Sequence, residues 1–194
     1  PGDAKNLSVT NSRTTKASVS STLMQQETRA DVASVGMGKL PADGGRSKIY
    51  LHPGQLFASA ERSAVSTILG SCVAVCLWDP ISKIGGINHY LLPLWTGEGT
   101  ASPRFGNVAV QDLLNRLLEL GSQKRRLQAK LFGGACVIEA FRERENHLGT
   151  KNVQAAEELL GKEGIPLVGH DVGGCRGRKL IFHTDNGTAW VRQL

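Results

Sequence analysis

Two residues of the chain, Cys72 and His89, have side chains that together could attack a carbonyl carbon. A neighbouring imidazole stabilises a thiolate, so we expect the pKa of Cys72 to fall from about 8.5 towards neutrality. The preceding Gly70-Ser71 turn can expose backbone N–H groups, which are suited to binding the oxyanion of a tetrahedral intermediate. The hydroxyls of Ser66 and Thr67 are candidates for a third group that orients the imidazole.

The segments that carry these residues form a predicted β-hairpin. Residues 73–78 and 84–92 are apolar and rich in β-branched side chains, and they flank the turn sequence DPISK. Side chains alternate between the faces of a strand, so a turn of two or four residues leaves Cys72 and His89 on one face, with Cβ atoms within roughly 4.5–8 Å. A register slip of one residue would separate them.

The same residues also fit a purely structural role. Free cysteines are commonly buried, so Cys72 and Cys76 could both be small core residues, and His89 a hydrogen-bonded core histidine. We assign Cys76, four residues after Cys72, to the core. Their C-x3-C spacing is that of neither a redox motif nor a zinc site, so we expect no structural zinc. Attack by a thiol with an imidazole as base needs no metal and no organic cofactor, so we expect neither. A disulfide between them is disfavoured, because they would lie roughly 13 Å apart along one strand.

The other histidines lack a comparable partner in the sequence. They are His52, His147, His170 and His183. His170 is followed by Asp171, but neighbouring residues of a strand point to opposite faces.

The remaining pattern predicts an α/β fold in which strands outnumber helices. Further strands are expected at 48–51, 65–69, 127–132, 165–172, 179–184 and 188–192, and helices at 108–120 and 150–162. Because two strand pairs are hairpins, we predict a layered α/β sandwich with mixed, largely antiparallel sheets rather than a doubly wound parallel sheet.

Composition limits the class of protein. With 194 residues and 40% apolar content, the chain can bury one core, which we place in a domain over 48–194. Residues 1–47, rich in Ser, Thr, Ala and Gly, are predicted to be a disordered or loosely attached tail. We expect a cytoplasmic protein, because no apolar run is long enough to span a bilayer and no signal peptide is evident. The net charge of +6 is densest at Lys124-Arg125-Arg126, which fits either a solvated loop or a docking patch for an acidic protein surface; it lacks the aromatic residues of a nucleic-acid platform.

Several blocks of the sequence resemble the chemoreceptor glutamine deamidase CheD family. The resemblance rests on LGSCVAVCLWDP at 69–80 and GINHYLLP at 86–93. It continues through FGN at 105–107, AKLFGGA at 129–135, IPLVGHDVGG at 165–174 and GRK at 177–179, and it covers residues 48–194 nearly end to end.

The resemblance implies hydrolysis of specific glutamine side chains of bacterial chemotaxis receptors to glutamate and ammonia, through a glutamyl thioester. It implies a fold related to the deamidase domain of cytotoxic necrotizing factor toxins. The family's nucleophile falls on Cys72 and its histidine on His89. Its third catalytic residue, a threonine six positions before the cysteine, falls on Ser66, which keeps the hydroxyl.

The resemblance also implies partners and a second possible role. The substrate would be the cytoplasmic helices of methyl-accepting receptors, and a CheC-type phosphatase is a further partner. We expect a monomer that neither binds nucleic acid nor inserts into a membrane. A side activity on receptor glutamate methyl esters is also implied. The alternative function is that of a chemotaxis adaptor, which binds receptors or a CheC-type phosphatase with little catalysis of its own.

Overall fold

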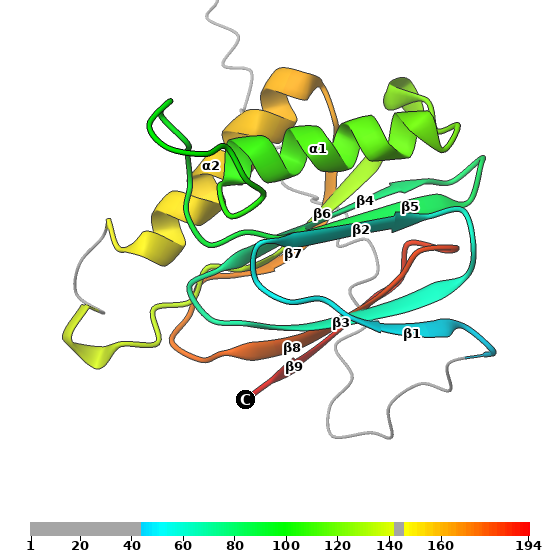
Figure 1. Ribbon diagram of the computed structural model, residues 1–194. Coiled ribbons are helices and arrows are strands. Elements are labelled where there is room, and N and C mark those ends of the chain that lie inside the picture. The colour runs from blue at the N-terminus through cyan, green and yellow to red at the C-terminus, as the bar shows by residue number, and fades with distance from the viewer. Residues whose placement is uncertain (1–43, 142–145) are drawn as a thin grey trace, which may run out of the picture.

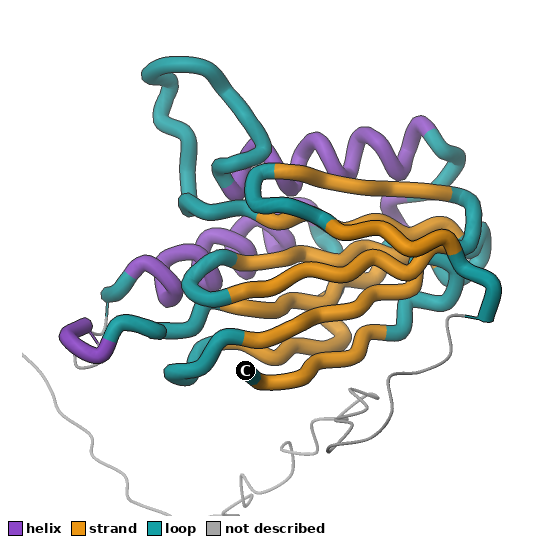
Figure 2. The backbone as a smooth tube through the Cα atoms, turned by 60° about the horizontal axis from the view of Figure 1, so that its bottom comes forward, coloured by secondary structure: helices purple, strands orange, loops and turns teal. Residues whose placement is uncertain are grey.

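Two stacked β-sheets and two helices make up the part of the chain that the structure describes. The computed structural model describes residues 44–141 and 146–194. Helices α1 (Gly106–Glu119) and α2 (Leu148–Glu163) lie on one face of a five-stranded sheet, whose other face packs against a four-stranded sheet (Figure 1). The outer face of the four-stranded sheet has no described helix in front of it (Figure 2).

The two sheets draw their strands from both halves of the chain. The four-stranded sheet has the order β1 (Ser47–Tyr50), β3 (Ser63–Leu69), β8 (Arg178–His183), β9 (Ala189–Gln193). The five-stranded sheet has the order β2 (Gln55–Ser59), β5 (Ile84–His89), β4 (Val73–Asp79), β6 (Gln128–Gly133), β7 (Leu167–Val172). Short 3-10 helices lie at Lys124–Arg126 and Glu139–Phe141.

The predicted fold class is confirmed. Only the pairings β1–β3 and β6–β7 are parallel among the described strands, so both sheets are mixed and largely antiparallel. The strand β2 was not predicted from the sequence. The predicted strand 84–92 ends three residues earlier in the structure, because Tyr90 makes only an isolated bridge to Val73. The predicted tail lies almost wholly outside the described residues, and the division into tail and domain stays a prediction.

Alternation along β4 divides the interior into two apolar cores. Val73, Val75 and Leu77 face the helices and pack with residues such as Leu113 of α1. The intervening side chains face the second sheet, where Ala74 and Cys76 pack with Val65, Leu69, Ile87, Phe132, Leu180 and Phe182. The core assignment of Cys76 is therefore confirmed.

The turn between β4 and β5 is built around Asp79, whose side chain is fully buried. Its carboxylate accepts the N–H groups of Ile81 at 2.9 Å and Ser82 at 3.2 Å. The other oxygen accepts from the N–H of Gln123 at 3.2 Å and pairs with the guanidinium of Arg126 at 3.0 Å. These contacts close a four-residue turn, which fixes the register of the two strands.

Each residue of the basic triplet Lys124-Arg125-Arg126 contacts a neighbouring side chain of the fold, and a docking role for the triplet stays a prediction. Arg126 binds Asp79, Lys124 pairs with Glu163 at 2.6 Å, and Arg125 donates to the side chain of Gln123.

None of the described helices is long and apolar enough to cross a bilayer.

Replacing Asp79 is expected to destabilise the protein. Asp79→Ala removes three backbone N–H···O bonds and leaves the Arg126 guanidinium without its partner, so the free energy of unfolding should fall by about 3 kcal/mol in urea denaturation. Glu119→Ala removes only an exposed ion pair with Arg116 and should cost about 0.5 kcal/mol or less. Equal effects of the two substitutions would contradict this account of the turn.

Candidate active site

The segment Gly70–Cys72 carries the chain from one sheet to the other. Leu69 ends β3 in the four-stranded sheet, and Val73 begins β4 in the five-stranded sheet. Cys72 is half-buried, and its side chain packs against the core between the sheets. The thiol therefore lies where the inter-sheet core meets the molecular surface.

Backbone contacts from the loop after β6 hold this crossing in place. The carbonyls of Gly70 and Cys72 accept the N–H groups of Ala135 and Gly134, both at 2.8 Å. Gly133 has φ 107, and a Cβ at this position would collide with the carbonyl oxygen of Cys72. A glycine is required there by both its conformation and its close approach.

His89 is the last residue of β5 and is only 1% exposed. Because Cys76 pairs with Ile87 in the four-residue hairpin, His89 extends the face that points towards the second sheet. Cys72 points towards the same side, so the prediction that the two side chains share a face is confirmed.

Thr67, on β3 of the opposite sheet, binds the imidazole. Its Oγ1 lies 2.8 Å from Nδ1 of His89 and donates its hydrogen to the carbonyl of Leu51, also at 2.8 Å. A hydroxyl has one hydrogen, which Thr67 donates to Leu51, so Oγ1 accepts the hydrogen bond from Nδ1–H of His89. This fixes the tautomer and leaves Nε2 with a free electron pair. Nε2 is buried and has no hydrogen-bond partner among the described residues.

The prediction that Ser66 orients His89 is wrong. Its hydroxyl donates to the carbonyl of Ile49 at 3.3 Å, and Ser66 pairs with Tyr50, which is 50% exposed on the outer face of the sheet. Successive residues of β3 point to opposite faces, so only Thr67 points inward. Thr67 lies two residues from each of the buried residues Val65 and Leu69, so its side chain shares their face of the strand. This alternation distinguishes the two hydroxyls.

Burial keeps both reacting groups neutral at rest. Desolvation lowers the pKa of His89 to about 4, although the Leu51 carbonyl partly opposes this. Burial also raises the pKa of the Cys72 thiol, and the N–H of Cys72 itself offsets only part of the effect. The expected thiolate–imidazolium pair with a lowered cysteine pKa is therefore wrong for the resting site. At rest Cys72 is therefore a neutral thiol and His89 a neutral imidazole.

The remaining histidines are placed in other environments. His147 caps α2 by accepting the N–H of Thr150, His52 stacks edge-on against Tyr50, His183 is buried against Trp190, and His170 is exposed on β7. No group of three His, Cys, Asp or Glu side chains within 44–141 and 146–194 is placed to hold a metal ion.

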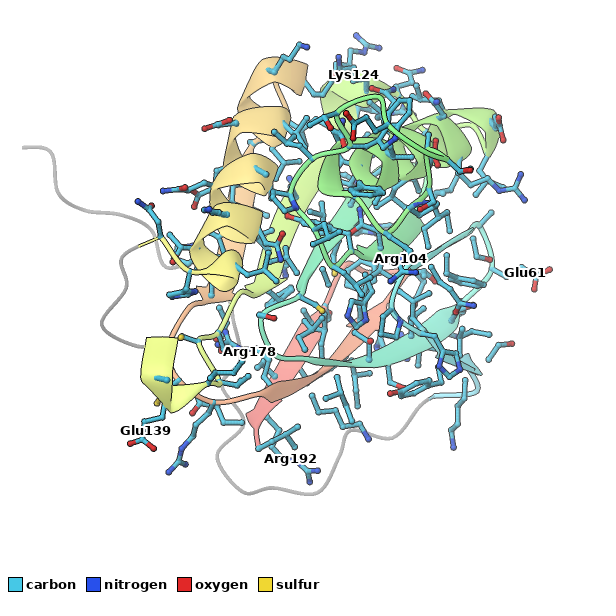
Figure 3. The ribbon with its side chains drawn as sticks, turned by 60° about the vertical axis from the view of Figure 1, so that its left-hand side comes forward. Glu61, Arg104, Lys124, Glu139, Arg178 and Arg192 are labelled. Carbon is cyan, nitrogen blue, oxygen red and sulfur yellow. The ribbon has the colours of Figure 1, made fainter. Side chains whose placement is uncertain are left out.

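Arg178 supports the site indirectly. It is only 2% exposed, and its guanidinium donates to the carbonyls of Asp171 and Gly173 and to the Asp171 carboxylate. In the loop that Arg178 holds, the carbonyl of Gly174 accepts a hydrogen bond from the N–H of Cys136 at 2.8 Å. Arg178 and the segment after β6 lie at the same end of the molecule (Figure 3). The sequence offers no signal for this role beyond the GRK motif.

Exposed apolar side chains lie on the segments next to the site. Val137 is 46% exposed and packs beside Gly70, where a Cβ would lie 3.5 Å from Val137 Cγ1. Ile138 is 55% exposed, and Leu92 and Leu94, which follow His89 closely in the chain, are 38% and 51% exposed. These four side chains are exposed apolar groups on the segments that flank Cys72 and His89.

Comparison with known proteins gives a consistent picture. A family model described as CheD chemotactic sensory transduction matches residues 91–193, a range that begins just after His89. The probable chemoreceptor glutamine deamidase CheD 1 of Anaeromyxobacter dehalogenans is 54% identical over 164 residues, covering 84% of this chain and 95% of its own. The probable CheD deamidases of Sulfurimonas denitrificans and Trichlorobacter lovleyi are each 43% identical, covering 76% and 72% of this chain and 94% and 86% of their own.

One solved structure is distantly similar. The crystal structure of the Bacillus licheniformis hypothetical protein YfiH aligns with a TM-score of 0.35 and 17% identity, over 58% of this chain and 47% of that one. This likeness is too weak to carry an argument about fold or function.

The Thr67–His89 contact predicts the effect of a matched pair of substitutions. Thr67→Val keeps the shape but removes the acceptor for Nδ1–H, so acylation of Cys72 by 4-nitrophenyl acetate should slow roughly 10- to 100-fold. Ser66→Ala should leave the rate unchanged, because that hydroxyl faces away from His89. Peptide mass spectrometry measures the acylation, and the opposite ranking of the two variants would restore Ser66 as the orienting residue.

Proposed function

The chain belongs to the CheD family, and we propose that Cys72 and His89 carry out the reaction by which it deamidates glutamine side chains of bacterial chemoreceptors. The three relatives described above, each named a probable chemoreceptor glutamine deamidase, match this chain along 86–95% of their own length, which supports the same activity here. Its activity is that of a protein-glutamine glutaminase. The observation that carries the mechanism is the 2.8 Å contact between Thr67 and Nδ1, which leaves Nε2 of His89 free as a base.

In the first step the Cys72 sulfur attacks Cδ of the substrate glutamine. Because the resting thiol is neutral, Nε2 of His89 removes its proton as the carbon–sulfur bond forms. The amide oxygen becomes an oxyanion, for which the backbone N–H of Cys72 is a donor, with that of Ser71 beside it. The Nδ1–H donated to Thr67 holds the imidazolium in the same orientation throughout.

In the second step the imidazolium returns a proton to the amide nitrogen. The carbon–nitrogen bond breaks, ammonia leaves, and Cys72 carries a glutamyl thioester. Neutral His89 then removes a proton from water, which attacks the thioester and displaces the Cys72 sulfur, which regains its proton. The balance is one glutamine side chain and one water converted to one glutamate and one ammonia.

Each turnover adds one negative charge to a receptor helix. Like charges three or four residues apart on a helix destabilise it by a few tenths of a kcal/mol, so the new carboxylate shifts the receptor's conformational equilibrium. The apolar surface formed by Val137, Ile138, Leu92 and Leu94 fits the apolar side chains of such a helix.

Three further features are proposed from the family resemblance. The protein works as a monomer, it acts in the cytoplasm where the modified receptor helices lie, and a CheC-type phosphatase binds it. Slow hydrolysis of receptor glutamate methyl esters follows from the same thioester chemistry, since methanol replaces ammonia as the leaving group.

Substitution of the two reacting residues tests the assignment. Cys72→Ala and His89→Ala should each abolish the mass increase of about one dalton per modified glutamine in a receptor cytoplasmic fragment, because an amide becomes an acid. Cys175→Ala and His170→Ala, both at exposed positions, are the matched controls and should keep full activity. Full activity of either reacting-residue variant would overturn the mechanism, and receptor binding by an inert wild type would favour the adaptor role.

The pH dependence should report the lowered pKa of His89. The base must be neutral, so the rate of Cys72 acylation by 4-nitrophenyl acetate should fall as the pH drops through about 4 and stay near its plateau between pH 5 and 7. Circular dichroism at each pH separates loss of the base from unfolding. A decline centred near pH 6.5 would show that His89 titrates as an ordinary imidazole.

A further inference from the structure

A fully buried amide on α2 joins the two segments that carry the reacting residues. Asn152 is 0% exposed, and its Nδ2 donates to the carbonyls of Ser71 and Leu91, both at 2.9 Å. Ser71 directly precedes Cys72, and Leu91 lies two residues after His89. The Asn152 side chain therefore connects the loop that carries Cys72, here called the nucleophile loop, to the segment that follows His89.

The orientation of this amide follows from its partners. Both are carbonyl oxygens, which only accept, so the nitrogen and not the oxygen of the Asn152 amide must face them. Its two hydrogens are then both used. The amide oxygen Oδ1 is buried and has no partner within the described residues. Leaving a buried acceptor unsatisfied costs stability, so the two donated bonds are kept in spite of this cost.

The neighbouring contacts make the amide a rigid support. The Tyr90 hydroxyl donates to the backbone carbonyl of Asn152 at 2.5 Å, and Tyr90 exchanges two backbone hydrogen bonds with Val73. The first turn of α2 also touches the loop after β6, since a Cβ at Gly149 would collide with the Gly134 carbonyl. The helix cannot move without disturbing both segments of the site.

The bond to Ser71 sets the direction of the N–H that follows it. In a trans peptide the C=O and the next N–H point in opposite directions. Because the Ser71 carbonyl points towards α2, the Cys72 N–H points away from the helix, to the side of the sheet where the thiol lies. The Cys72 N–H lies beside the residue's own thiol and makes no hydrogen bond to a backbone carbonyl among the described residues, so an oxyanion formed next to the sulfur can accept from it.

We propose that Asn152 is a positioning residue that aims the Cys72 N–H at the developing oxyanion and ties the His89 strand to the nucleophile loop. The bond to Ser71 supplies the first function and the bond to Leu91 the second. This inference rests on the proposed function, since it requires Cys72 to be the nucleophile.

Two probes of Cys72 distinguish this role from simple packing. Acylation by 4-nitrophenyl acetate passes through an oxyanion, whereas alkylation by iodoacetamide is a direct displacement that forms none. Asn152→Leu keeps the approximate size but has no N–H donors. In the full chain it should slow acylation about 10- to 100-fold, in line with the loss of an oxyanion donor, and change alkylation by about threefold or less.

The controls address folding and position on the helix. Gln154→Ala lies on an exposed face of the same helix and should change neither rate. Thermal unfolding by circular dichroism checks each variant. If Asn152→Leu does not fold, Tyr90→Phe serves instead, because it removes only the hydroxyl that anchors the Asn152 backbone and should lower the ratio of acylation to alkylation several-fold.

The outcomes separate this inference from the proposed function. A lowered ratio of acylation to alkylation supports it. An unchanged ratio, or equal losses in both reactions, overturns the positioning role while leaving Cys72 as the nucleophile. If wild-type Cys72 is not acylated, or if Cys72→Ala still deamidates the receptor fragment, the proposed function fails and this inference fails with it.

Discussion

The register between β4 and β5 is the constraint on which the site depends. A strand has a side-chain period of two, so a slip of one residue would turn His89 towards the helices and away from Cys72. The buried carboxylate of Asp79 prevents this by holding a turn of four residues, while its second oxygen binds Arg126. A contact at the opposite end of the strands thus determines which residues can react.

The position of the site between two sheets determines its chemistry. The interior disfavours charge, so His89 is a neutral base and Cys72 a neutral thiol until a substrate arrives. Without further support, a buried imidazole could carry its proton on either nitrogen. Thr67, reaching from the other sheet, settles this by accepting from Nδ1. In the proposed mechanism the two sheets supply different parts of one catalytic group, and the reaction requires their stacking.

Much of the architecture follows from local patterns. The β4–β5 hairpin, both helices and the C-terminal hairpin were predictable from apolar periodicity and turn residues, and the shared face of Cys72 and His89 followed from strand alternation. The strand β2 was missed because QLFAS is short and only partly apolar. Counting back from Cys72 placed the family's third residue on Ser66 while Thr67 stayed a candidate, whereas burial at Val65 and Leu69 shows which hydroxyl points inward.

The sequence alone predicted the fold class, the candidate pair Cys72 and His89 and the resemblance to a deamidase family, because strand alternation and motif spacing are local properties of a chain. Only the tertiary structure decided that Thr67 orients His89, that the pair is neutral at rest, and that Asn152 and Arg178 support the loops around it. These properties arise from contacts between segments far apart in the chain and from the polarity of the space they enclose. Neither is encoded in the spacing of residues along one strand.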